Sequence, residues 1–135
     1  MKIKKVNEMI DTDSITHVIG KKINDSVPVT NSRKISQWFV DNSMSSHKEG
    51  HISLLKNLIT ELTELFGVYN KGMRLEFLTK VWILKYKDLT FNIFTAKGKG
   101  TSIEVCDLKY EDIRNGKYEN EIIEFLQKLY ELINK

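Results

Sequence analysis

The sequence predicts an α+β domain with N-terminal helices, a three-stranded antiparallel β-meander and a C-terminal helix packed on the sheet. Three observations carry this prediction. The 135 residues are the size of one domain. Apolar residues recur at helical spacing before residue 68 and after residue 118, and at a period of two between these segments. We therefore expect a helical part over about 1–68, and the meander with its closing helix over about 69–135.

Two short helices are expected first. Apolar residues at helical spacing predict a helix from Asp13 or Ser14 to about Asn24, and Pro28 then forces Val27 out of helical geometry. The next helix runs to about Asn42, and its N-terminal cap is Thr30, Asn31 or Ser32. Its apolar stripe, which would anchor it to the core, consists of Ile35, Trp38 and Phe39.

A third helix is predicted from about Gly50 to Phe66, with Gly67 as its end. Its apolar residues repeat at three and four: Ile52, Leu55, Ile59, Leu62 and Phe66. This broad apolar face is typical of a helix packed against the core.

The strands follow. Leu75 to Tyr86 reads as a central strand, because both of its faces are apolar. Lys87-Asp88 marks a turn, after which Leu89, Phe91 and Ile93 line one face of the second strand. Lys97-Gly-Lys-Gly100 is the next turn, and Thr101 to Cys106 forms the third strand.

The closing helix is predicted from about Glu119 to Ile133, after a short helical turn at Glu111–Arg114. Its core residues are Ile122, Phe125, Leu126, Leu129, Tyr130 and Ile133.

Composition narrows the class of protein. Apolar residues make up 41% and charged residues 29%, which is ordinary globular composition. The single cysteine, Cys106, excludes an internal disulfide framework and fits a reducing compartment. No segment is apolar enough for a membrane span and no secretory signal follows the basic start, so we expect a cytoplasmic protein without a membrane partner. No phosphate loop or dinucleotide fingerprint is present, and no cofactor is expected.

Nucleic-acid binding is one hypothesis. The two helices over about 14–42 would form a helix-turn-helix-like unit. Its second helix carries side chains suited to base or phosphate contact, which are Asn31, Arg33, Lys34 and Gln37. Residues 71–99 hold seven basic and two acidic side chains, a local charge of +5, and Lys97 and Lys99 protrude on their turn.

Metal chemistry is a second hypothesis. His47 and His51 are four residues apart, although no third ligand is evident. A metal-dependent nuclease would use acids in the order Glu61 or Glu64, Asp88, then Asp107-Leu-Lys109. Neither pattern places its residues well, so we predict no metal site and no catalytic residue.

Aromatic side chains on the first strand raise a third hypothesis. Trp82 and Tyr86 share a strand face, with Phe94 beside them on the neighbouring strand. If helices leave this face open, a protein partner or a second copy in a homodimer would cover it. If helices cover it, the three residues belong to the core.

The leading interpretation is a small non-catalytic binding protein that acts on a protein partner. By analogy with other small α+β proteins, it fits an accessory or inhibitor protein of a phage or mobile element. Nucleic-acid binding is the alternative, and the nuclease is the second alternative.

Overall fold

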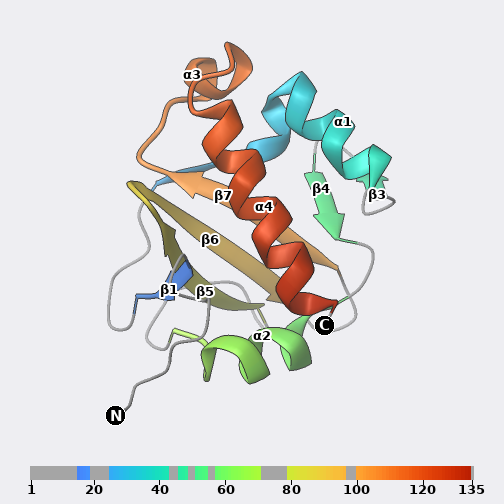
Figure 1. Ribbon diagram of the computed structural model, residues 1–135, viewed down its shortest axis with the longest axis vertical. Helices are drawn as coiled ribbons and strands as arrows, with labels where there is room; N and C mark the ends of the chain where they lie inside the picture. The colour runs from blue at the N-terminus through green and yellow to red at the C-terminus, as the bar shows by residue number, and fades with distance from the viewer. Residues whose placement is uncertain are drawn as a thin grey trace.

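The computed structural model describes residues 15–18, 25–42, 46–48, 51–54, 57–70, 79–96 and 100–134. Figure 1 shows helix α4 (Glu119–Ile133) lying across one face of an antiparallel sheet, with α1 and α3 near one end of α4 and α2 near the other. This arrangement confirms the predicted α+β class.

All strand pairs in the sheet are antiparallel, and the order is β1-β5-β6-β7-β4-β3. The described strands are β1 (Ile15–His17), β2 (Ser26–Pro28), β3 (Ser46–Lys48), β4 (His51–Leu54), β5 (Thr79–Tyr86), β6 (Leu89–Ala96) and β7 (Thr101–Cys106). The predicted meander is the centre of this sheet, β5-β6-β7. Two short strands share the outer edge of β7, because β2 pairs with its C-terminal half and β4 with its N-terminal half.

The prediction of a helix from residue 13 or 14 to residue 24 is wrong for the residues of this range that the structure describes. Residues 15–17 form β1, in which Ile15 pairs with Tyr86 and His17 with Leu84 of β5. The Val18 amide continues this pairing by donating to the Ile83 carbonyl at 2.8 Å. Residues 26–28 form β2. In the described residues 15–18 and 25–28, pairing with β5 and β7 therefore replaces the helix and turn that the helix-turn-helix-like unit over 14–42 requires.

The helix predicted from residue 50 to 66 is correct only in its second half. Residues 51–54 form β4, which pairs with β3 on one side and with β7 on the other. Helix α2 occupies Ile59–Phe66, and Gly67 ends it with φ at +85° as expected. The turn at Lys97–Gly100 has only Gly100 within the described residues.

The remaining helices agree with the prediction. Helix α1 spans Arg33–Asp41 after a 3-10 turn, η2, at Val29–Asn31. Helix α3 is the short helical turn before α4 and covers Tyr110–Arg114. None of the helices in the described ranges combines the length and apolarity that a bilayer span requires.

The main core lies between α4 and the helix-covered face of the sheet. The Phe125 ring of α4 stacks on the Phe91 ring of β6, with 3.9 Å between ring centroids and 4° between planes. Residues alternate along β5 as expected: Trp82, Leu84 and Tyr86 belong to this core, and Val81 and Ile83 point to the other face. All five are at most 2% exposed, which confirms that β5 is a central strand.

Candidate nucleic-acid interface

Helix α1 presents its polar face to solvent because its apolar stripe is anchored. Ile35 and Phe39 are buried in the core. Trp38 is half-buried and packs edge-on against the rings of Phe39 and Tyr130. The opposite face therefore leaves Arg33, Lys34 and Gln37 exposed, as the sequence predicted.

The start of α1 is fixed to the start of α4. Ser32 caps α1 by accepting from the Ile35 amide at 3.2 Å, and its hydroxyl donates to a Glu119 carboxylate oxygen at 2.7 Å. Lys34 Nζ donates to Asn120 Oδ1 at 3.2 Å. Because Ser32 is only 1% exposed, its two hydrogen bonds are shielded from water, whereas the contact between Lys34 and Asn120 is exposed.

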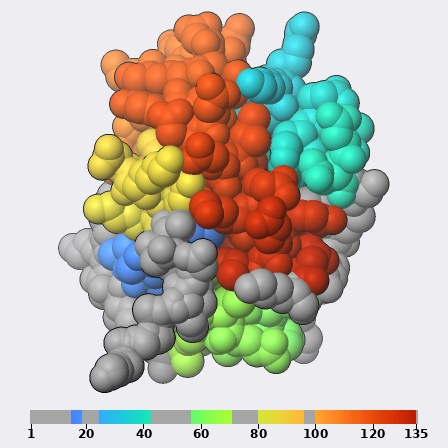
Figure 2. All heavy atoms as spheres, in the orientation of Figure 1, coloured from blue at the N-terminus to red at the C-terminus, as the bar shows by residue number. Residues whose placement is uncertain are grey.

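Between these helices and α3 lies an open groove of about 530 Å³. Its lining comes from three parts of the chain: Arg33, Lys34 and Gln37 of α1; Arg114 of α3 with Asn115 and Gly116 after it; and Glu119 of α4. Figure 2 shows α1 and the α3–α4 segment side by side on this face of the molecule. Gly116 has φ at +86°, a conformation that favours glycine and lets the chain turn from α3 into α4 at the groove.

The groove is electrostatically positive. Arg33, Lys34 and Arg114 line it, and within the described part of the chain none of them forms an ion pair with a carboxylate. Glu119, the one acid among the lining residues, accepts a hydrogen bond from Ser32. Among the lining residues, three cations therefore surround one carboxylate.

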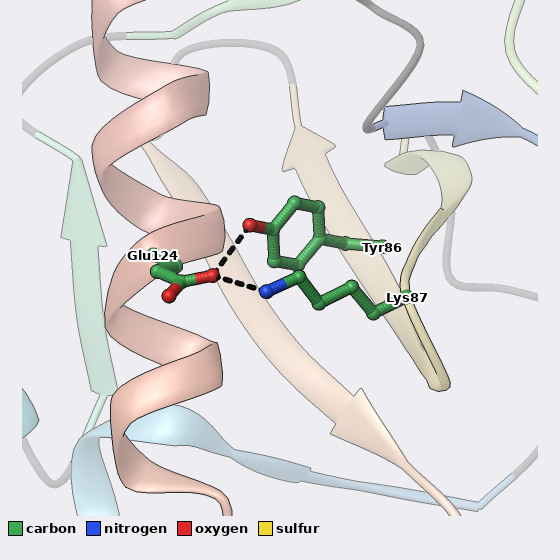
Figure 3. A network of polar contacts seen from close by, with 3 residues as sticks. All are labelled: Tyr86, Lys87 and Glu124. Carbon is green, nitrogen blue, oxygen red and sulfur yellow. Dashed lines mark hydrogen bonds and ion pairs between the residues drawn. The ribbon is translucent and has the colours of Figure 1, made fainter.

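Lys87 contrasts with these groove cations. It forms an ion pair of 2.7 Å with Glu124 on α4, and the hydroxyl of the buried Tyr86 ring donates to the same carboxylate oxygen at 2.7 Å, as Figure 3 shows. Hydrogen bonds from Lys87 and Tyr86 lower the pKa of the Glu124 carboxyl below its ordinary value. The hydrogen bond to Glu124 raises the pKa of Lys87, and burial raises the pKa of Tyr86. This cluster ties the β5–β6 turn to α4 and is structural.

Three further residues were predicted to contact nucleic acid. Asn31 belongs to η2, and its amide nitrogen is buried rather than directed into the groove. Lys97 and Lys99 lie outside the described residues. The groove therefore brings together three of the six predicted residues.

The predicted aromatic interface is largely internal. Trp82 is 0% exposed and Tyr86 is 2% exposed, and Phe94 is half-buried on the opposite face of the sheet. Trp82 also donates from its indole nitrogen to the Gly67 carbonyl at 2.9 Å. The core alternative thus applies to Trp82 and Tyr86, because α4 and its neighbours cover their face.

The metal hypotheses gain no support from the geometry. Among the described residues, no three histidine, cysteine, aspartate or glutamate side chains gather where they could hold a metal ion. This group includes the nuclease candidates Glu61, Glu64, Asp88 and Asp107. His47 and His51 lie on the paired strands β3 and β4 rather than on one helix, opposite Ile52 and Lys48 respectively.

Sequence reasoning missed four lining residues, which are Arg114, Asn115, Gly116 and Glu119. They lie about 80 residues from α1 along the chain, and no local spacing connects them to it. The sequence did predict the short helix before α4, but it did not indicate that this helix would lie next to α1.

Comparison with known proteins finds no family model, no curated protein and no solved structure that matches the chain. The functional argument therefore rests on the groove itself.

Proposed function

We propose that the protein is a non-catalytic nucleic-acid-binding protein that contacts the phosphate backbone in the groove between α1, α3 and α4. The observation that carries this proposal is the convergence of Arg33, Lys34 and Arg114 on one open groove without carboxylate partners among the described residues.

The chemistry of these side chains fits a phosphodiester chain. Arginine presents a planar fork of donors that can bind two phosphate oxygens at once, and lysine supplies a compact positive charge. Gln37 is exposed in the same groove and donates from its amide to Asp41 on α1 at 2.8 Å, so it is a polar side chain held at the groove surface. Phosphate contacts of this kind position a protein on nucleic acid without reading sequence.

We prefer nucleic-acid binding to the protein-partner interpretation because of where the predicted interface residues lie. The partner interface predicted from the sequence consists of Trp82, Tyr86 and Phe94. Trp82 and Tyr86 are in the core, and Phe94 is half-buried on the opposite face of the sheet. The groove cations Arg33, Lys34 and Arg114, in contrast, are exposed.

The test is the affinity for a labelled 20-nucleotide oligomer, measured by fluorescence anisotropy over a range of salt concentrations. We expect the protein to bind the oligomer, and we expect the logarithm of the association constant to fall steeply with the logarithm of the salt concentration. The double variant R33A/K34A should bind more weakly and reduce the salt slope by about one unit for each phosphate that the protein no longer neutralises. The matched control is Lys80→Ala/Lys85→Ala, which removes the same charge from β5.

Equal weakening by both double variants would indicate a general charge effect and would contradict the groove proposal. Absence of binding at low salt would overturn the function itself.

A further inference from the structure

We propose that the groove takes single-stranded nucleic acid, with bases stacking on Tyr110 and Tyr118. This inference rests on the proposed function and specifies its ligand. It comes from the aromatic side chains around α3, which the phosphate argument does not use.

Tyr110 and Tyr118 are unusually accessible for aromatic side chains. Tyr110 is 52% exposed and Tyr118 is 40% exposed, whereas Trp82, Phe91 and Phe125 are fully buried. The two tyrosines flank the segment that supplies Arg114 and Gly116 to the groove. Exposed rings beside a basic groove are the elements of a single-strand site, in which bases stack on aromatic faces while cations follow the backbone.

A cationic side chain lies over each of the two tyrosine rings. The Arg114 guanidinium carbon lies 6.0 Å from the centre of the Tyr110 ring, and Lys117 Nζ lies 5.5 Å from the centre of the Tyr118 ring. Arg114 therefore connects Tyr110 directly to the groove that it lines. Each exposed ring thus has a cation beside it, so a base on the ring and a phosphate on the cation could belong to neighbouring parts of one strand.

The backbone at Tyr118 supports a role for this side chain beyond packing. Its φ is +58° and its ψ is +20°, the left-handed region that glycine or asparagine adopts at lower cost. Tyr118 precedes the first turn of α4 and makes no side-chain cap there. A tyrosine is therefore held in a backbone conformation that glycine would adopt at lower cost.

Nearby acids limit the strength of the site without removing it. Glu111 and Asp112 belong to α3, and the Asp112 carboxylate accepts from the Lys109 amide at 3.2 Å at the start of that helix. Among the residues that line the groove, the cations Arg33, Lys34 and Arg114 still outnumber the one acid, Glu119.

Single strands are favoured over a duplex because bases in a duplex are already stacked and paired, so they present no free face to a tyrosine. Stacking on a ring is also tolerant of sequence. We therefore expect binding to both DNA and RNA single strands with little dependence on which base is present.

The experiment compares a 20-nucleotide oligothymidine, a 20-nucleotide oligouridine and a mixed-sequence DNA duplex of 20 base pairs, using the intact chain. We expect both single strands to bind about tenfold or more tightly than the duplex. Tyr110→Ala and Tyr118→Gly should each weaken single-strand binding by roughly tenfold. Tyr110→Phe and Tyr118→Phe keep the ring and should keep the affinity.

Tyr118→Gly separates binding from folding, since it relieves the left-handed tyrosine. Its midpoint of thermal unfolding should equal or exceed that of the unchanged protein while its affinity falls. Duplex binding as tight as single-strand binding, with the tyrosine variants unaffected and R33A/K34A weakened, would overturn this inference and leave the proposed function standing. Absence of binding to all three probes would overturn both.

Discussion

The side-chain amide of Asn70 acts as a backbone partner for Ile83. The Ile83 amide donates to Asn70 Oδ1 at 3.0 Å, and Asn70 Nδ2 donates to the Val18 carbonyl at 2.7 Å. One asparagine side chain therefore continues the pairing between β1 and β5 beyond the end of β1. His17 lies against the same oxygen, with 2.6 Å between its Nε2 and Asn70 Oδ1.

Replacing Asn70 should destabilise the folded protein. Asn70 is only 6% exposed, so Asn70→Ala leaves the Ile83 amide buried without its acceptor. We expect a loss of about 1–3 kcal/mol in the free energy of unfolding. Chemical denaturation measures it, with Asn120→Ala on the exposed side of α4 as the control, for which a change within about 0.5 kcal/mol is expected. Equal effects of the two variants would contradict the bridging role.

Acid should weaken the cluster of Tyr86, Lys87 and Glu124. The pKa of Glu124 is lower in the folded protein, so its contribution is fully present above the unfolded value of about 4.3 and is lost as the pH falls through the folded value. The stability difference between the unchanged protein and Glu124→Gln should therefore be largest near pH 6 and shrink toward pH 2. Thermal unfolding at a series of pH values measures this, and a difference that is independent of pH below 5 would refute it.

The buried leucines of α2 and α4 should be important for stability. Leu62 is 0% exposed and Leu126 is 2% exposed. Leu62→Ala and Leu126→Ala each remove methyl groups from the closed core, and each should cost about 2–5 kcal/mol. Denaturant unfolding tests both. Losses below about 1 kcal/mol at both positions would show that these helix faces are not buried as described.

Glu119 should oppose ligand binding in the groove. Its carboxylate is the one negative charge among the lining residues, and Glu119→Gln keeps an oxygen that can accept from Ser32. We expect this variant to bind single-stranded oligomers more tightly, by a factor of about 2–10 as for a screened charge near a surface. Glu131→Gln, farther along α4, is the control. Unchanged affinity in Glu119→Gln would place the strand outside the groove.

The sequence predicted elements with their own long periodic pattern. Helix α4 begins and ends at the predicted residues because its apolar stripe repeats over four turns. The predicted alternation along β5 and β6 is also correct, since a period of two over eight residues separates Trp82 and Leu84 from Val81 and Ile83. The expectation that Phe94 lies beside Trp82 is wrong, because the register pairs Phe94 with Val81 on the other face.

The errors fell on strands of three or four residues. Ile15 and Val18 share a helical spacing by chance, and β1 has too few residues to show a period of two. What makes these residues a strand is pairing with β5, about 70 positions away. Half of the groove was missed for a related reason: Arg33 and Lys34 could be identified as exposed helix residues, but their neighbours on α3 and α4 are set by tertiary packing alone.

The shared outer edge of β7 has a kinetic consequence. Ser26 pairs with Cys106 and Ser53 with Ser102, so both segments hydrogen-bond to a strand that is synthesised much later. Neither β2 nor β4 can acquire these partners until residues 101–106 have left the ribosome. Such distant pairings raise the contact order of the chain, and folding on the millisecond-to-second timescale is expected, with the β5–β6 hairpin able to form before these edge strands dock.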